Sequence, residues 1–400
     1  MPALSKRHTR VPVAATMAMT AKAREMRAAG VNVISLTIGE PDFASPPHAS
    51  EAAHQAALQG MTKYTPQDGV VAMKQAIQRK FVRDSGLDFA LDEITVSAGG
   101  KQAIFNALMA TVDDGDEVVI PAPYWGAYPL ITQLVGGVPV SVACPSNGGF
   151  KLRPEALAAA ITPRTKWLIL NFPNNPTGAT CSAEEMAAIG EVMARHPHVW
   201  IMSDDMYEHL LYTGTPQVTM AAVVPSLRHR TLTVSGVSKT YAMTGWRVGF
   251  SAGPRALIKA MSAMQGHATA GISGINQAAA AAALDGPQDS VAVQAAAYRT
   301  RRDLVVEGLN AAKGIVCHQP QGAFYVFPDV TGCLGKTTAA GVRIETDADF
   351  ALALLEEQHV ATVHGAAFGM SPFVRISYAT DDASLVEACT RIQAFCAALS

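Results

Sequence analysis

Apolar strands alternate with helical segments between residues 94 and 251, and this alternation constrains the fold more than any other feature. Runs rich in Val, Ile and Leu predict strands at 94–98, 117–120, 138–142, 167–170, 199–202, 231–234 and 248–251. The segments between them predict helices at 101–112, 125–135, 153–161 and 182–195. Apolar strands separated by helices form a mainly parallel sheet with both faces covered. Ligands of such sheets lie at the carboxyl ends of the strands, so functional residues are expected directly after strands.

Shorter elements flank this region and predict a second, smaller α+β domain. Before the sheet we expect a strand at 31–36 and helices at 16–29, 48–59 and 69–85. After it we expect helices at 254–284, 288–312, 347–357 and 382–398 and short strands at 324–327, 360–363 and 373–377. The N-terminal segment is expected to join the tail. The predicted division is therefore a large domain at 48–290 and a small domain built from 1–47 and 291–400.

The composition excludes several classes of protein. The chain has 400 residues, of which 49% are hydrophobic and only 16% charged, so part of its surface is expected to be hidden in an oligomer. A formal net charge of −2 argues against a nucleic-acid-binding protein. No run approaches 18 apolar residues, and the N-terminus has no continuous apolar core. We therefore expect no membrane span and no signal peptide.

The cysteines argue against a structural metal site. They are scattered along the chain and form no C-x-x-C pair: Cys144, Cys181, Cys317, Cys333, Cys389 and Cys396. Free thiols are typical of a reducing compartment, so we expect a cytoplasmic protein.

The stretch from Ser235 to Gly249 carries the first candidate site residues. Lys239 follows the apolar run Thr231–Val234, and Arg247 lies among small residues eight positions further on. A lysine at the end of a buried strand loses hydration, which lowers its pKa and frees its amine as a nucleophile. An arginine with small neighbours suits a phosphate dianion. An aldehyde that carries a phosphate, such as pyridoxal phosphate, would satisfy both residues; the alternative is two solvated loop residues.

Other polar or aromatic residues also follow predicted strands. Gly100 and Lys101 open a helix whose N-terminus can hold phosphate, although a plain tight turn is an alternative. Trp125 can stack on a ring or can pack in the core. Asp204 follows a fully apolar strand, where a carboxylate needs a cationic partner, unless it only caps a helix. Arg375 lies inside an apolar strand, where it suits a bidentate carboxylate or a structural salt bridge.

Three motifs in the chain resemble those of one known family. Gly236-Val-Ser-Lys239 and Gly245-Trp-Arg-Val-Gly249 resemble the pyridoxal-phosphate attachment signature of class I aminotransferases, and Asn171-Phe-Pro-Asn-Asn-Pro-Thr-Gly178 resembles another motif of that family. The resemblance extends from about residue 10 to 398 and is closest to the bacterial aspartate/prephenate aminotransferase branch. It implies an α/β fold of pyridoxal-phosphate fold type I, with a mainly parallel seven-stranded sheet in the large domain.

The resemblance also implies a role for each matching residue. Lys239 would bind the cofactor covalently and move a proton, and Asp204 would hold the pyridine nitrogen. Asn175 and Tyr207 would contact the edge of the ring, and Trp125 would stack on its face. The phosphate would be held by Gly100, Lys101, Ser238 and Arg247. For the substrate, Arg375 and Gly39 would bind the α-carboxylate beside Trp125 and Asn175, and Lys101 and Thr16 would bind a distal carboxylate. Tyr64 would reach the phosphate of a neighbouring subunit, which implies a homodimer with shared active sites.

The expected activity is transfer of an amino group from an L-amino acid, aspartate or glutamate, to a 2-oxo acid by ping-pong chemistry. Three departures from the family pattern leave alternatives open. Gly236 replaces a frequent phosphate-binding serine, which Ser235 could compensate, and Ala14 replaces a serine that often helps to bind acidic substrates. Thr269-Ala-Gly-Ile272 replaces a family motif near the subunit interface. The alternatives are broader specificity for aromatic or neutral amino acids, or a lyase on the same fold.

Overall fold

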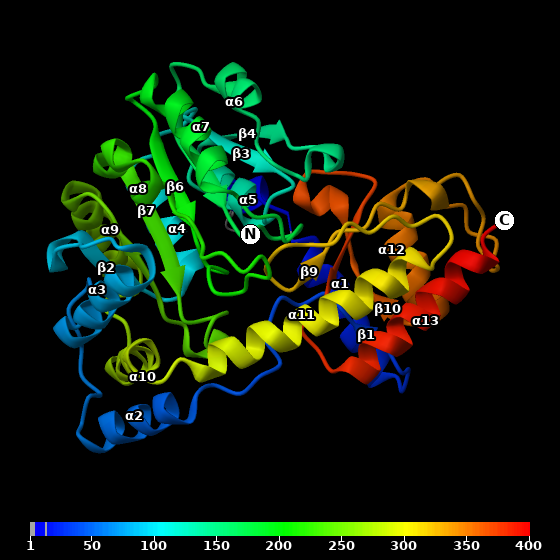
Figure 1. The fold of residues 1–400 in the computed structure, drawn as a ribbon, viewed down its shortest axis with the longest axis horizontal. Helices are drawn as coiled ribbons and strands as arrows, with labels where there is room; N and C mark the ends of the chain where they lie inside the picture. Colours follow the sequence, from blue (N-terminus) through cyan, green and yellow to red (C-terminus); the bar gives the residue numbers. More distant parts are fainter. Residues whose placement is uncertain (1–4, 13) are drawn as a thin grey trace.

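A seven-stranded sheet forms the centre of the computed structural model, which describes residues 5–12 and 14–400 (Figure 1). The strands are β2 (Ile94–Ser97), β3 (Glu117–Ala122), β4 (Val138–Ala143), β5 (Thr165–Asn171), β6 (Trp200–Asp204), β7 (Thr231–Gly236) and β8 (Gly249–Ala252). Their order is β2-β8-β7-β6-β5-β3-β4, and β8 alone runs antiparallel to its neighbours. The predicted mainly parallel seven-stranded sheet is confirmed.

Helices cover both faces of this sheet because side chains alternate along its buried strands. Trp167 and Ile169 of β5 pack in one core, whereas Leu168 and Leu170 pack in another. The first core is closed by α4 (Gly100–Met109), α5 (Ala127–Leu134) and α9 (Arg255–Ala268). The second is closed by α6 (Pro154–Ala160), α7 (Ala183–Ala194) and α8 (Met220–Val223).

The prediction of one helix at 254–284 is wrong, because two helices occupy that region. After α9, residues 269–273 form a break, and α10 (Gly274–Asp285) begins behind Ser273, whose side chain accepts a hydrogen bond from the amide of Asn276. Ala270 has a left-handed backbone with φ of 57°, and the Thr65 hydroxyl donates to the Ile272 carbonyl at 2.7 Å. Helix α10 packs with α2 (Pro47–Leu58) and α3 (Val71–Ser85) at the β2 and β8 side of the sheet.

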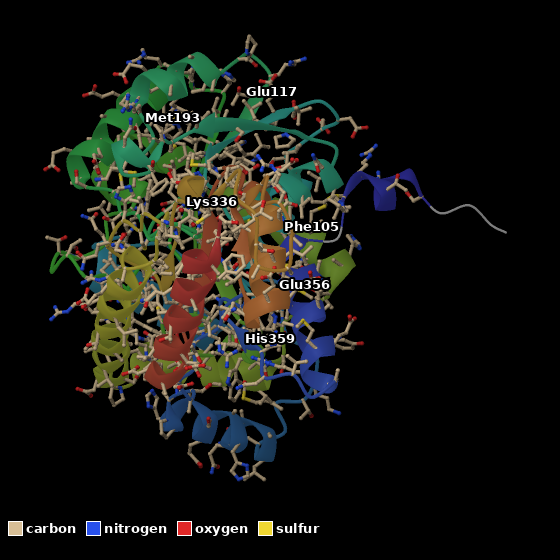
Figure 2. All side chains as sticks on the ribbon, turned by 90° about the vertical axis from the view of Figure 1, so that its right-hand side faces the viewer. Phe105, Glu117, Met193, Lys336, Glu356 and His359 are labelled. Atoms are coloured by element: carbon tan, nitrogen blue, oxygen red, sulfur yellow. The ribbon has the colours of Figure 1, made fainter. Side chains whose placement is uncertain are left out.

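The two ends of the chain meet in a second group of elements. Strands β9 (Tyr325–Val326), β11 (Val363–His364) and β12 (Val374–Ser377) form an antiparallel sheet, and β1 (Ile34–Ser35) pairs in parallel with β10 (Val360–Ala361). The predicted strands at 31–36 and 360–363 are thus shorter or divided. Helices α11 (Asp289–Asn310), α12 (Asp347–Gln358) and α13 (Asp382–Ala398) lie side by side (Figures 1 and 2). The division into domains at 48–290 and at 1–47 with 291–400 stays a prediction.

The N-terminal helix α1 (Ala15–Ala28) joins this second group. Figure 2 shows α1 beside α12, where Lys22 pairs with Glu356. Short 3₁₀ helices occupy Lys6–Arg10, Leu91–Glu93, Ser146–Gly148, Pro225–Arg230, Thr244–Trp246, Thr331–Cys333 and Gly365–Phe368. In residues 5–12 and 14–400, every helix is too short or too polar to cross a membrane.

Candidate active site

A cavity of about 700 Å³ opens at the carboxyl ends of β2, β3, β5, β6 and β7, where the strand pattern places functional residues. It brings together twelve of the thirteen predicted site residues: Thr16, Gly39, Gly100, Lys101, Trp125, Asn175, Asp204, Tyr207, Ser238, Lys239, Arg247 and Arg375. Tyr64 is the exception, since it lies outside the cavity of this single chain with 97% of its surface exposed.

Lys239 directly follows β7 and presents its amine to this cavity. Its Nζ donates a hydrogen bond of 2.5 Å to the carbonyl of Gly39. Burial lowers the pKa of this amine to about 8, and the cations Arg375, Arg247 and Lys101 act in the same direction, whereas Glu40 opposes them. A substantial fraction of the amine is therefore neutral, and nucleophilic, slightly above neutral pH.

Asp204 ends β6 and is only 4% exposed. One carboxylate oxygen accepts a hydrogen bond of 2.6 Å from the Tyr128 hydroxyl, and the other accepts one from the Met206 amide at 3.3 Å. Burial raises the pKa of this carboxyl to about 6. Within residues 5–12 and 14–400, no cationic side chain pairs with it. A buried carboxylate in this position suits a ligand that carries a positive charge.

The start of α4 forms a cradle suited to an anion. Gly99 has φ of +87°, and a Cβ there would lie 2.6 Å from the Arg247 guanidinium, so only glycine fits. Within the described residues, Arg247 donates to two backbone carbonyls, those of Thr244 and Ala98, and to no side chain. Lys101 stands over the Trp125 ring at 5.0 Å, and burial together with Arg247 lowers its pKa. Two cations beside a helix N-terminus suit a multiply charged anion.

Ser238 lines the cavity, whereas Ser235 does not. Ser238 is buried and lines the cavity beside Lys239. The hydroxyl of Ser235 instead donates to Glu208, and the residue is not part of the cavity wall. The possible compensation of Gly236 by Ser235 therefore has no support from this geometry.

Arg375 on β12 is buried at 3% exposure and offers a free donor. Its Nη2 donates to the Thr37 carbonyl at 2.5 Å and its Nη1 to the Asn175 side-chain oxygen at 3.0 Å. Its Nε has no hydrogen-bond partner, and the described part of the chain gives the guanidinium no acidic partner. The alternative of a structural salt bridge is therefore wrong, and the free donor suits a carboxylate that arrives with a ligand.

Sequence reasoning missed two tyrosines of the site. Tyr128 lies three residues after Trp125 on α5, meets that ring edge-on and holds Asp204. The hydroxyl of Tyr325 lies 2.8 Å from that of Tyr207, and a Cβ on Gly39 would approach it to 1.8 Å. Helical spacing from Trp125 could have pointed to Tyr128, whereas nothing near Tyr325 in the sequence marks it.

Asn175 and Thr16 also line the cavity. The Asn175 amide donates to the Asn171 side chain at 2.9 Å, and the Asn171 amide group donates to the Asp204 carbonyl, so the asparagine loop is fixed to the end of β6. Thr16 lies near the start of α1, where its carbonyl accepts a hydrogen bond from the Thr20 hydroxyl. The cavity thus combines a reactive amine, a buried carboxylate, an anion cradle and a free arginine donor.

Comparison with known proteins gives the family. The family description "Aminotransferase class I and II" matches residues 31–392. The chain is 56% identical to the aspartate/prephenate aminotransferase of Cereibacter sphaeroides (strain ATCC 17029 / ATH 2.4.9), with 99% of each chain covered. It is 52% identical to the aspartate aminotransferase of Rhizobium meliloti (strain 1021), covering 99% of this chain and 97% of that one.

Solved structures agree along the whole length. The aspartate aminotransferase from Rhizobium meliloti superposes with a TM-score of 0.98 at 52% identity, with 100% of both chains covered. The Thermus thermophilus aspartate aminotransferase with maleate gives a TM-score of 0.92 at 40% identity, covering 99% of this chain and 100% of that one. The resemblance expected from the sequence is confirmed, and the chain belongs to the class I and II aminotransferases.

Proposed function

We propose that this aminotransferase uses pyridoxal phosphate, held covalently by Lys239. The observation that carries the proposal is the buried Asp204 carboxylate, which has no cationic partner in the described chain and faces the same cavity as the Lys239 amine. A protonated pyridine nitrogen would supply the missing positive charge. The cradle of Gly100, Lys101 and Arg247 fits the phosphate in charge and in backbone geometry.

Each of these residues has its own role in the reaction. When bound, pyridoxal phosphate withdraws electrons from the substrate Cα and carries the amino group between the two half-reactions. Once the substrate amine has replaced it in the covalent bond to the cofactor, Lys239 Nζ would accept the proton that leaves Cα and later return it, as a base with a lowered pKa can do near neutral pH. Asp204 keeps a proton on the ring nitrogen, and Tyr207 and Asn175 bind at the ring edge.

Further residues position the two ligands. Trp125 stacks on the ring, which excludes water from one face. Arg375 and Gly39 bind the substrate α-carboxylate, so that Cα lies within reach of Lys239. The free Nε of Arg375 supports this role, because it leaves a buried N–H donor for an incoming carboxylate.

We propose an acidic amino acid, aspartate or glutamate, as the amino donor. Two curated relatives are named for aspartate, and one solved relative was described with maleate, a dicarboxylate. Lys101 and Thr16 would bind the distal carboxylate. The cavity wall also contains the apolar side chains of Val11, Met17 and Ile131. These side chains favour a bulkier acidic substrate, such as prephenate, as a second substrate. Prephenate appears in the name of the Cereibacter relative.

Replacing Lys101 with alanine is expected to lower kcat/KM for aspartate by roughly tenfold to a hundredfold, because one charge-assisted contact contributes about 1.5–3 kcal/mol. Donors without a second carboxylate, such as leucine and phenylalanine, should lose much less. The measurement is a panel of amino donors with 2-oxoglutarate as acceptor, run on wild type and on the variant. Equal losses for aspartate and phenylalanine would assign Lys101 to the phosphate cradle and not to substrate choice.

We propose a homodimer in which Tyr64 completes the partner's phosphate site. Leu58, Met61 and Val71, which lie near Tyr64 in the sequence, are also exposed, and this supports a surface covered by a partner subunit. The unpaired state of the six cysteines agrees with the proposed cytoplasmic location.

Hybrid dimers test the shared site. A Lys239→Ala subunit paired with a Tyr64→Phe subunit should hold one complete site, and should turn over at about half the wild-type rate. Both parent homodimers should be slower, because each carries its defect in both sites. Verified hybrids that are no faster than the mean of their parents would argue against sharing.

A further inference from the structure

A buried ion pair lies behind the cavity, outside its wall. Glu208 closes the run Ser203–Glu208, which also carries Asp204 and Tyr207, and it is 8% exposed. Its Oε2 accepts a hydrogen bond of 2.5 Å from the Nζ of Lys80 on α3, which is 2% exposed. Neither residue lines the cavity, so the mechanism above leaves this pair unused.

The other oxygen of Glu208 reaches the strand that leads to the reactive lysine. The Ser235 hydroxyl on β7 donates to Glu208 Oε1 at 2.6 Å, and Lys239 follows four residues later. The backbone repeats this connection, since the Asp205 amide donates to the Val234 carbonyl at 2.8 Å and the Glu208 amide to the Asp205 carbonyl at 3.0 Å. The Glu208 carboxylate therefore links α3 and β7 to the segment Ser203–Glu208, which carries Asp204 and Tyr207.

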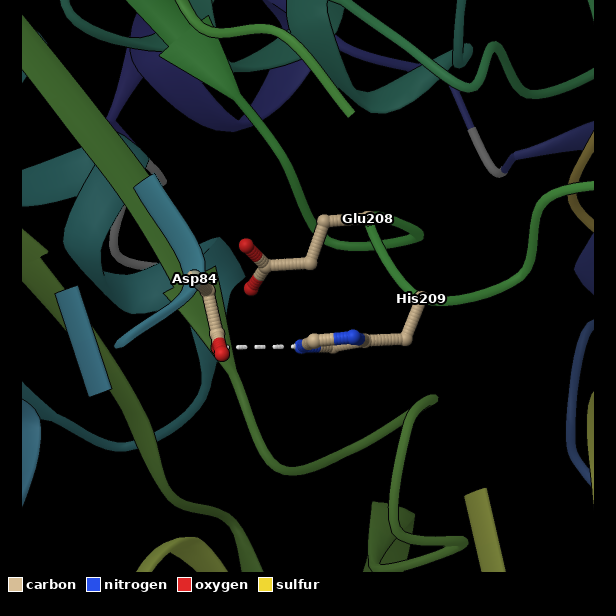
Figure 3. A group of neighbouring side chains, drawn as sticks. All are labelled: Asp84, Glu208 and His209. Carbon is tan, nitrogen blue, oxygen red and sulfur yellow. Dashed lines mark hydrogen bonds and ion pairs between the residues drawn. The ribbon is translucent and has the colours of Figure 1, made fainter. Parts of the chain in front are cut away.

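The surrounding charges show an ionic cluster and not a metal centre. Figure 3 shows the side chains of Asp84, Glu208 and His209 turned toward one another, with the imidazole joined to Asp84 at 3.2 Å. The Lys80 amine lies 3.7 Å from Asp84 as well as against Glu208, and Arg83 bonds Asp84 at 2.7 Å. Lys80 and Arg83 already balance the two carboxylates.

We propose that Glu208 is a positioning residue, whose hydrogen bond from Ser235 fixes the segment carrying Asp204 and Tyr207 relative to the strand that leads to Lys239. Lys80 is the counter-ion that allows a carboxylate to be buried at this junction. Buried ion pairs add little net stability compared with apolar packing, whereas an unpaired buried charge is costly. The role of the ion pair is therefore to fix the position of the Glu208 oxygen that accepts the hydrogen bond from Ser235. The inference rests on the proposed function, in which Asp204 and Lys239 act on the two sides of one cofactor.

Two charge-free double variants separate the hydrogen bond from the ion pair. Lys80→Met with Glu208→Gln keeps an acceptor for Ser235, and Lys80→Met with Glu208→Leu removes it. Both variants remove the ammonium and the carboxylate of this ion pair together. Ser235→Ala removes the same hydrogen bond but leaves the ion pair intact. Asp84→Asn is the matched control, because it removes an ion pair from the same cluster without touching the Ser235 contact.

The leucine double variant and Ser235→Ala are expected to lose roughly tenfold to a hundredfold in kcat, the cost of slightly misplaced reacting groups. Their KM for the amino donor should stay within about twofold, since Arg375 lies on a different sheet. The glutamine double variant should keep most of its kcat. Asp84→Asn should keep its kcat even where its melting temperature falls.

Hydrogen exchange of the cofactor-free protein supplies a readout that does not depend on activity. The Asp205 and Glu208 amides should exchange at least about tenfold faster in Ser235→Ala and in the leucine double variant, and at the wild-type rate in the glutamine double variant. Equal behaviour of the two double variants, in kcat and exchange, would overturn the proposal, as would unchanged kcat and exchange in Ser235→Ala. Failure of the proposed function would instead appear in wild type, as a protein that does not form a covalent bond from Lys239 to pyridoxal phosphate.

Discussion

Lys239→Ala is expected to reduce turnover by several orders of magnitude. The variant loses the covalent link to the cofactor and also the amine that moves the proton at the substrate Cα, and the proton transfer alone contributes roughly 10²–10⁴-fold. The cradle at the start of α4 and the Asp204 carboxylate remain, so the variant should still bind pyridoxal phosphate without a covalent bond. Steady-state kcat measures the first effect. Mass spectrometry after borohydride reduction measures the second, because wild type should be modified on the peptide containing Lys239.

A matched control uses Lys259, an exposed lysine on α9 that does not line the cavity. Lys259→Ala should keep the wild-type kcat and the borohydride modification on the peptide containing Lys239. Normal turnover in Lys239→Ala, or borohydride modification at another lysine, would remove Lys239 from the assigned role.

Asp204→Asn is expected to lower kcat by roughly tenfold to a hundredfold, the range for losing one hydrogen bond to a charged group. An amide at this position can still accept from Tyr128 but cannot hold a proton on the ring nitrogen as a carboxylate does. The measurement is kcat at saturating cofactor, so that weaker binding is not mistaken for slower chemistry. A kcat within about threefold of wild type, roughly 0.7 kcal/mol of barrier, would mean that another group performs this task.

The same substitution is expected to stabilise the cofactor-free protein near neutral pH. Burial raises the pKa of the Asp204 carboxyl from 3.8 to about 6, so the folded chain holds this proton more tightly than the unfolded chain. The stability contributed by the proton is complete below about pH 4 and is lost as the pH rises through about 6, because the folded protein must then bury an anion. Two pKa units correspond to about 3 kcal/mol.

Melting temperatures at two pH values test the direction of this pH dependence of stability. Cofactor-free Asp204→Asn should melt above wild type at about pH 7 and close to it at about pH 4, since an amide does not titrate. The same difference at both pH values would show that the change comes from packing and not from the proton. A gain in stability together with a loss of kcat would mark Asp204 as a residue kept for function at a structural cost.

The sequence alone was sufficient to predict those site residues that follow a strand or open a helix with a clear local pattern. Asp204 could be placed at the cavity because it follows an apolar run long enough to be a buried strand, and strand ends meet at one edge. The cradle at Gly100 was readable for the same reason. These residues depend on the order of strands and helices, which hydrophobic periodicity reports directly. Asn175 was implied by the resemblance of its motif.

Features that depend on distant contacts could not be predicted. Tyr325 belongs to the site through a hydroxyl contact with Tyr207, 118 positions earlier in the chain. The break between α9 and α10 is fixed by Thr65, 207 positions from the Ile272 carbonyl that it bonds. The alanine-rich sequence of α10 favours helix without marking where it starts. In each case tertiary packing decides an outcome that local propensity leaves open.

The pairing of the two chain ends has a consequence for synthesis. Ile34 of β1 pairs with Val360, and the Thr37 carbonyl receives its hydrogen bond from Arg375. A chain that leaves the ribosome from its N-terminus has made Asp204 and Lys239 long before it makes either of these partners. The segment around β1 therefore lacks these two contacts until residues 360–375 emerge. The arginine side is therefore the last part of the cavity that a nascent chain can complete.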